Sequence, residues 1–230
     1  SKITIPDLKK IRVTDPLFSH YTGMVAKKMI PVQWEILNGK QGQSRCFCID
    51  NFRIAGGTLQ GEHRGVVFGD TDAYKWLEAV AYCANNGETE YIPEADELIE
   101  IIGQAQQPDG YLNTYFTVCH PELRWKNLTE GHELYSAGHL IEAAVAYYNA
   151  TGKRRLLDIA AKFADLICQT FGDGEGQIPG YPGHQEIEPK EFKRFKLNQD
   201  GDKAEIKVKD AIGLLYTFFA DGEEKLLSTY

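Results

Sequence analysis

The stretch LEAVAYCANNG, residues 77–87, returns in similar form as IEAAVAYYNATG, residues 141–152. The shared AVAY and the glycine that follows it both recur after 65 residues. Apolar residues at three- and four-residue spacing predict a helix in each copy, and Asn or Gly at its end supplies the left-handed residue that closes a helix. Each copy therefore predicts a helix that stops at a glycine turn.

A second helical pattern follows each turn, EADELIEIIGQAQ at residues 94–106 and KRRLLDIAAKFADLICQTF at residues 153–171. The later pattern keeps apolar residues on one helix face, namely Leu156, Ile159, Ala160, Phe163, Ile167 and Phe171. Two helices joined by a short turn form an αα-hairpin, and hairpins repeated in sequence predict a solenoid or a toroid. The predicted fold class is therefore mainly α.

Two loops of unusual composition follow the hairpin patterns, QQPDGYLNTYF at residues 106–116 and GDGEGQIPGYPGHQE at residues 172–186. They recur at nearly the repeat interval, so we expect both on the same rim of the helical scaffold. Loops carried by a rigid scaffold are where binding sites usually lie.

The two ends of the chain have residue patterns that differ from those of the predicted hairpins. Residues 16–39 predict a helix interrupted at Pro31, because proline removes a backbone hydrogen bond. Residues 191–210 alternate polar and apolar side chains around a QDGD turn, which predicts a short β-hairpin. A short helix is expected after it, at residues 211–227. We expect residues 1–188 to form the helical domain and residues 189–230 a divergent tail.

Composition limits the classes of partner and the compartment. The 230 residues carry 25 Lys and Arg against 33 Asp and Glu, a formal net charge of −8, which argues against nucleic acid or an anionic membrane as partner. No apolar run approaches the roughly 20 residues of a membrane helix. Five scattered cysteines indicate reduced thiols and a cytoplasmic protein. The C-x-C pair Cys46 and Cys48 is interpreted as buried apolar side chains, and no metal site is predicted.

The stretch EGHELYSAGHLIEA, residues 130–143, puts two histidines near an expected helix start. A zinc-protease helix carries H-E-x-x-H, with its histidines one turn apart. His132 and His139 are seven residues apart, or roughly 10 Å along a helix, which excludes that metal site. His132, at the helix start, is the candidate functional histidine, and a capping or packing role is the equal alternative. His139 is interpreted as structural.

The two rim loops add groups that suit a sugar. In the later loop, His184 stands between Gly183 and Gln185, after two prolines that restrict the backbone. Asp109 and Tyr111 belong to the earlier loop. Aromatic faces beside carboxylate and imidazole groups match a polyhydroxylated ring, although a core position is the alternative for Tyr111. No phosphate loop, nucleophile elbow or assignable pair of catalytic carboxylates is evident.

Longer motifs add a resemblance to a known family. IPVQWEILNG, NFRIAGG, DAYKWLEAVAY, AQQPDGYLNTYF, RWKNLTEGHELYSAGHLIEAAVAYYNATGK and GYPGHQEIE occur in this order. Together they resemble the N-terminal half of the catalytic domain of glycoside hydrolase family 127, the β-L-arabinofuranosidase family, over about residues 11–188. The resemblance implies an incomplete (α/α)6 barrel.

The resemblance also implies a retaining hydrolysis by a cysteine thiolate held on zinc by glutamate and further cysteines, with a glutamate acid/base. The family's sugar-binding positions match His132, His184 and Gln33. Its acid/base, nucleophile and zinc ligands belong after the GHQE motif, where the remaining residues include no cysteine. No catalytic residue is therefore assigned, and zinc, the family's cofactor, is not predicted to bind this chain.

Three functions remain open at this point. The first is a β-L-arabinofuranosidase that is truncated or inactive, cleaving terminal β-L-arabinofuranosyl linkages by family. The second is a non-catalytic module that binds a small carbohydrate. The third is a sugar epimerase that uses His132 and His184 as acid and base. An incomplete toroid also exposes apolar helix faces, which predicts self-association.

Overall fold

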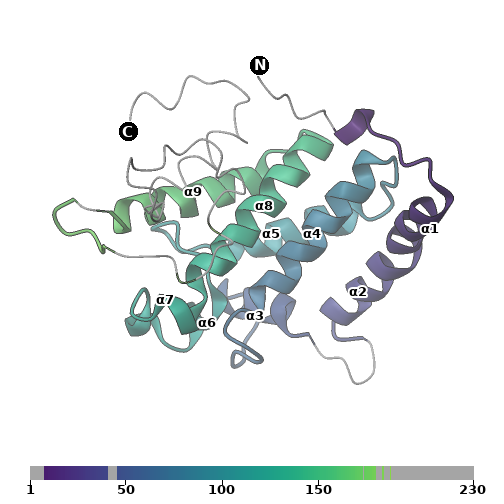
Figure 1. Ribbon diagram of the computed structural model, residues 1–230. Helices are drawn as coiled ribbons and strands as arrows, with labels where there is room; N and C mark the ends of the chain where they lie inside the picture. The colour runs from purple at the N-terminus through teal and green to yellow at the C-terminus, as the bar shows by residue number, and fades with distance from the viewer. Residues whose placement is uncertain (1–7, 41–45, 173, 180–182, 184–186, 188–230) are drawn as a thin grey trace, which may run out of the picture.

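The computed structural model describes residues 8–40, 46–172, 174–179, 183 and 187 (Figure 1). The tail at residues 189–230, with its predicted β-hairpin and helix, lies outside the described residues. Within them the chain forms helices and no β-strand. The elements are η1 (Leu8–Lys10), α1 (Pro16–Met24), η2 (Val25–Met29), α2 (Ile30–Leu37), α3 (Cys48–Ala55), α4 (Asp70–Asn85), α5 (Ile92–Ala105), α6 (Thr114–Val118), η3 (Pro121–Leu123), α7 (Leu128–Gly131), α8 (Glu133–Thr151) and α9 (Arg155–Thr170).

Both predicted hairpins are present. The first is formed by α4 and α5 and the second by α8 and α9. Gly87 (φ 91°) and Gly152 (φ 75°) take the left-handed backbone conformation at the two turns, which is the geometry that a glycine at a helix end provides. The repeated AVAY segment lies in the first helix of each hairpin.

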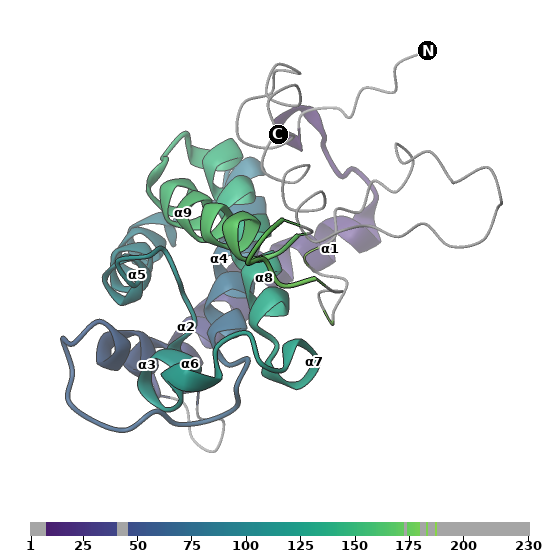
Figure 2. The same cartoon turned by 90° about the vertical axis from the view of Figure 1, so that its left-hand side faces the viewer.

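The helices pack in two rows. One row contains α2, α4 and α8, in which α4 packs against both neighbours, and the other contains α3, α5 and α9, in which α5 lies in the middle. Figure 2 shows α3, α5 and α9 on one side of α4 and α8, and α1 on the opposite side. Paired rows of helices built from sequential hairpins are the architecture of an α/α barrel, and this chain forms part of one.

The core lies between the rows. All six residues of the predicted α9 face are buried. Between α2 and α4, the rings of Trp34 and Trp76 stack with their centroids 4.7 Å apart. The indole N–H of Trp76 also donates to the carbonyl of Ile30, at 3.1 Å. The first row is therefore held by buried aromatic contacts as well as by aliphatic packing.

The predicted interruption at Pro31 takes the form of a π segment rather than a break. Helix α1 continues through η2, a five-residue π-helix, into α2. The amide of Ile30 donates to the carbonyl of Val25, five residues earlier. Pro31 then lies in the first turn of α2, where its missing N–H is tolerated. The wider turn lets one helical run cover residues 16–37.

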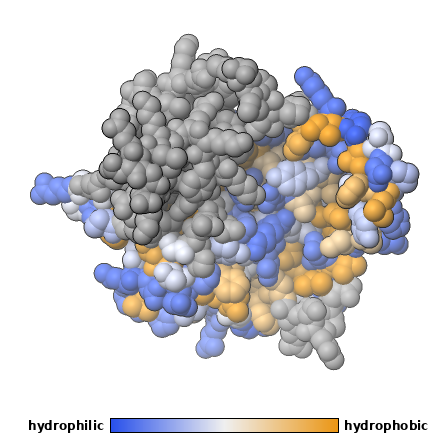
Figure 3. All heavy atoms as spheres, in the orientation of Figure 1, coloured by the Kyte–Doolittle hydropathy of each residue, from blue (hydrophilic) through white to orange (hydrophobic). Residues whose placement is uncertain are grey.

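Several apolar side chains on α1 and α2 face outward. Phe18 is 62% exposed, and Figure 3 shows hydrophobic side chains gathered over this part of the molecule. We call this set the α1–α2 apolar face; it comprises Leu17, Phe18, Tyr21, Met24 and Val32. Among the described residues, no helix combines the length and hydrophobicity that crossing a membrane requires.

Candidate functional site

His132 occupies the junction between α7 and α8, as its predicted place at a helix start requires. Its backbone is left-handed (φ 53°), so the chain turns sharply between the two helices. The Nδ1 atom lies 2.8 Å from the carbonyl oxygen of Glu130. Because a carbonyl oxygen only accepts hydrogen bonds, Nδ1 carries the proton, and this contact fixes the orientation of the ring.

Aromatic and cationic groups surround the half-buried His132 ring. The Phe68 ring lies 4.9 Å from it and the Tyr135 ring lies edge-on at 5.7 Å. The hydroxyl of Tyr135 in turn accepts a hydrogen bond from Lys75 Nζ, at 2.9 Å. An exposed aromatic face beside directional polar groups can stack on one side of a sugar ring and bond its hydroxyls at the edge.

A buried carboxylate supports this junction from beneath. Glu133, the first residue of α8, accepts hydrogen bonds from the Tyr111 hydroxyl (2.5 Å) and the Trp125 amide (2.9 Å). Burial raises its pKa to about 7. These contacts attach the start of α8 to the preceding loop and thereby hold His132 in place. Sequence reasoning missed Glu133, although a carboxylate at a helix N-terminus beside a candidate histidine was a usable signal.

Tyr111 was predicted to contact the sugar, but it is fully buried. Its ring is covered by the Arg124 guanidinium, 3.6 Å from the ring centroid, and lies edge-on to Phe163. Its hydroxyl is engaged by Glu133. In this arrangement Tyr111 offers no surface to a ligand, so the core alternative describes it and its role is to position Glu133.

Asp109 also builds the floor of the site. One of its carboxylate oxygens accepts from the Tyr111 amide at 3.0 Å, and the other pairs with Arg124 at 2.9 Å. The same loop is fastened to α9, because Gln106 Nε2 donates to the Ile159 carbonyl at 2.8 Å. Asp109 therefore closes the turn that carries Tyr111, while its side chain remains partly exposed.

Two further residues, Gln33 and His184, were predicted to bind the sugar. Gln33 is exposed on α2. His184 lies outside the described residues. The residue before it, Gly183, lies against α7: a Cβ built on it would be 2.7 Å from the carbonyl oxygen of Leu128. The second rim loop therefore reaches the helix that leads into His132.

The cysteine pair does not fit the zinc centre implied by the resemblance. Cys46 Sγ lies 3.3 Å from Cys48 Sγ and 3.4 Å from an oxygen of Asp72. In the part of the chain that the structure describes, the cysteines belong to no group of three converging metal-ligating side chains. They do not supply the set of thiolates that the family's zinc requires.

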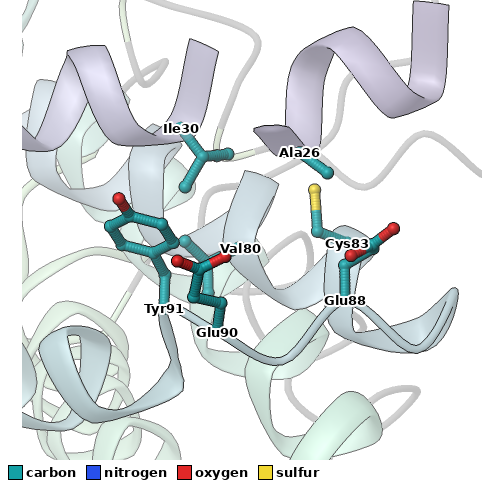
Figure 4. A pocket seen from close by; sticks show the side chains of 7 residues that line it. All are labelled: Ala26, Ile30, Val80, Cys83, Glu88, Glu90 and Tyr91. Atoms are coloured by element: carbon teal, nitrogen blue, oxygen red, sulfur yellow. The ribbon is translucent and has the colours of Figure 1, made fainter. Parts of the chain in front are cut away.

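A small cavity lies away from these groups, between the first helical run and the α4–α5 turn (Figure 4). Its volume is about 10 Å³, which is room for at most about one water molecule. It cannot hold a furanose. Its lining residues are Ala26, Ile30, Val80, Cys83, Glu88, Glu90 and Tyr91.

The fold defines a protein of the α/α-barrel class, of which this chain forms part. The particular family follows from comparison: the chain belongs to glycoside hydrolase family 127. The family model described as "Beta-L-arabinofuranosidase, GH127 catalytic domain" matches residues 10–197.

Named relatives agree with this assignment. The chain is 36% identical over 196 residues to the non-reducing end β-L-arabinofuranosidase of Bifidobacterium longum subsp. longum, covering 77% of this chain and 30% of that protein. The crystal structure of a GH127 β-L-arabinofuranosidase from Geobacillus stearothermophilus T6 is 54% identical, with a TM-score of 0.73, covering 77% of this chain and 28% of the other. A GH127 β-arabinofuranosidase structure has 32% identity and a TM-score of 0.70, with coverages of 79% and 29%. The chain thus spans less than a third of each relative.

Proposed function

We propose that this chain forms the sugar-binding wall of a β-L-arabinofuranosidase of the retaining type and binds a terminal β-L-arabinofuranosyl unit. The observation that carries the proposal is the fixed His132 imidazole on the rim, beside the exposed Phe68 ring. Two relatives with this activity in their names are 36% and 54% identical to the chain over the 77% of it that aligns, and the second, a solved structure, shares its fold. The proposal keeps Gln33 and His184 as further sugar contacts, on the strength of the family motifs.

The chain's own residues account for binding and orientation. His132 Nε2 is the ring atom available to bond a sugar hydroxyl, because Nδ1 is engaged by Glu130. Phe68 offers an apolar face to one side of the furanose, and Glu133 keeps the imidazole in position from beneath. Zinc with its thiolate would supply the nucleophile in a complete family member, and no described residue takes that role here.

Calorimetry with L-arabinose tests the binding. A lone monosaccharide on a partial site is expected to bind with a Kd on the order of 1 mM, or about −4 kcal/mol. His132→Ala should weaken binding at least tenfold, because the fixed imidazole is lost. Lys153→Ala, in the turn beyond the far end of α8, is the matched control and should leave binding unchanged. Absence of heat at tens of millimolar sugar would refute the proposal.

Turnover distinguishes an active enzyme from a binding fragment. Release of p-nitrophenol from its β-L-arabinofuranoside should stay at background with or without added zinc, because no described residue supplies the nucleophile. Substantial turnover would mean that the 230-residue chain carries its own reactive centre. Product analysis by NMR after incubation with free aldoses separates either outcome from epimerisation.

Two broader aspects belong to the same proposal. A second copy of the chain covers the α1–α2 apolar face, because contiguous apolar surface of this kind favours association. A cytoplasmic location is favoured by the five cysteines, all of which are free thiols.

A further inference from the structure

Three metal-ligating side chains meet between α4 and α8, away from the cysteine pair. Glu78 extends from α4, and His139 and Glu142 extend from α8. One donor atom from each lies within 4.8 Å of the other two. His139 Nδ1 is 3.8 Å from Glu142 Oε2. The sequence did not predict that these residues meet, because only the packing of α4 against α8 brings them together.

The cluster is sheltered and its members are held in place. The side chains of His139 and Glu142 are 12% and 24% exposed. Tyr82, one turn after Glu78, donates from its hydroxyl to a Glu78 carboxylate oxygen at 2.8 Å. The edge of the Tyr135 ring packs on His139, with centroids 4.7 Å apart. Hydrogen bonds of this kind orient the ligands of metal sites. The bond from Tyr82 uses one carboxylate oxygen of Glu78 and fixes the rotamer that positions the other.

We propose that Glu78, His139 and Glu142 bind one divalent transition-metal cation of the zinc class. A zinc ion with bonds of about 2.0–2.2 Å gathers its donors to roughly 3.3 Å from one another. The His139–Glu142 pair is already near this separation, and small side-chain rotations bring Glu78 in. The cation would also relieve the repulsion between two neighbouring carboxylates.

The donor set selects the kind of ion. One imidazole nitrogen and two carboxylate oxygens suit zinc, cobalt or manganese, with zinc the tighter binder in the usual affinity order. Magnesium prefers oxygen ligands and retains its waters, so it should bind poorly. Three protein ligands leave a fourth position open to water or another small ligand. The site contains no sulfur and is therefore separate from the thiolate-bound zinc of the family.

Calorimetric titration of the chelator-treated chain with ZnCl₂ and MgCl₂ tests the proposal. The background is Cys46→Ser with Cys48→Ser, which removes the cysteine pair as an alternative zinc site. We expect one equivalent of zinc with a micromolar or tighter Kd, and no magnesium binding at millimolar concentration.

Two substitutions probe the ligands. Glu78→Gln keeps the side-chain shape and an oxygen that accepts from Tyr82, yet should weaken zinc binding at least tenfold. His139→Gln should do the same. Glu97→Gln, which removes an exposed glutamate from α5, is the matched control and should leave the affinity unchanged. Circular dichroism confirms that each variant remains folded.

Cobalt provides a second readout. The visible spectrum of the cobalt-loaded chain should show nitrogen and oxygen ligation without a thiolate charge-transfer band, and Glu78→Gln should abolish it. The proposal is overturned if no zinc binds in the background that carries Cys46→Ser and Cys48→Ser, if a thiolate band dominates, or if Glu78→Gln and Glu97→Gln bind zinc equally.

Discussion

At the scale of single residues, the site depends on a backbone conformation that histidine rarely adopts. The left-handed φ of His132 costs roughly 1–2 kcal/mol for a residue with a Cβ. The chain retains it because Glu133 is bonded on both carboxylate oxygens and the imidazole is bonded to Glu130. The strained backbone of His132 therefore sets the direction of its imidazole, and the hydrogen bonds of the buried Glu133 carboxylate stabilise that backbone.

Comparing His132→Gly with His132→Ala separates the effect of the backbone strain on stability from the effect of the imidazole on sugar binding. Both variants lose the imidazole, so both should lose the calorimetric response to L-arabinose. Glycine tolerates a positive φ, so His132→Gly should be more stable than His132→Ala by about 1 kcal/mol, or about 2–4 °C in Tm for a chain of this size. Thermal unfolding of the two variants side by side checks this. Equal Tm values would show that the backbone strain is absent.

Glu133 should make stability depend on pH. Its pKa is raised by burial from 4.5 to about 7 in the folded chain. The folded chain therefore holds this proton more tightly than the unfolded chain does, and the stability gained is complete below about pH 4.5 and lost as pH rises through about 7. The loss is up to about 3 kcal/mol. In Glu133→Gln this part of the pH dependence should disappear.

Urea unfolding at a series of pH values measures the effect. The exposed-residue variant Glu97→Gln should keep the slope of the parent chain. Parallel curves for the parent chain and Glu133→Gln would contradict the assigned role of Glu133.

The residues of the site were only partly predictable from sequence. His132 was found because its motif marks a helix start. Tyr111 was assigned to ligand contact because composition cannot tell a rim tyrosine from a buried one; its burial depends on Phe163, more than 50 residues away, and on Arg124 above its ring. Glu133 was missed for a related reason, since its partners come from other segments.

At the scale of elements, local patterns carried most of the prediction. The two hairpins were predicted from apolar spacing and terminal glycines, both of which are short-range signals. Pro31 shows the limit of such signals. The proline rule predicts a disturbed helix, but whether the chain stops or widens into a π turn depends on packing, here of α2 against α4. The arrangement of helices in two rows required the structure.

The rim loop should be sensitive to a methyl group at Gly110. A Cβ there would be 2.5 Å from the Lys162 carbonyl oxygen, whereas Gly87, with a similar φ, has no atom within 4 Å of its Cβ position. Gly87→Ala should cost about 1 kcal/mol for the backbone conformation alone. Gly110→Ala should cost about 2 kcal/mol more, because the loop must move off α9. Chemical unfolding of the pair gives the difference, and equal losses would refute the close packing of this loop.

At the scale of the whole molecule, the chain presents part of a larger architecture. It aligns with less than a third of each relative. Its α4 and α8 row carries both the proposed sugar site and the proposed cation site, while α1 and α2 expose an apolar face. The incomplete toroid predicted such exposure, but which helices carry it was not predictable, because neighbouring elements decide which face of a helix points outward.

The α1–α2 apolar face should drive self-association. Sedimentation equilibrium is expected to show dimers or larger species at tens of micromolar. Phe18→Glu should shift the distribution toward monomer, because it places a charge in the centre of the buried contact. Val66→Glu, at an exposed apolar residue outside this face, is the matched control. A parent chain that remains monomeric throughout would rule the contact out.

The π segment at Val25–Met29 has a consequence for how this face is oriented. A π turn behaves as one surplus residue in an otherwise regular helix. Because the wide turn absorbs this extra residue, α1 keeps the direction it would have on a regular helix one residue shorter. The same residues wound as a regular α-helix would instead turn α1 by about 100° about the helix axis relative to α2. The width of this one turn therefore decides which side chains of α1 face solvent, and a deletion within it that restores ordinary winding would leave that exposed face in place.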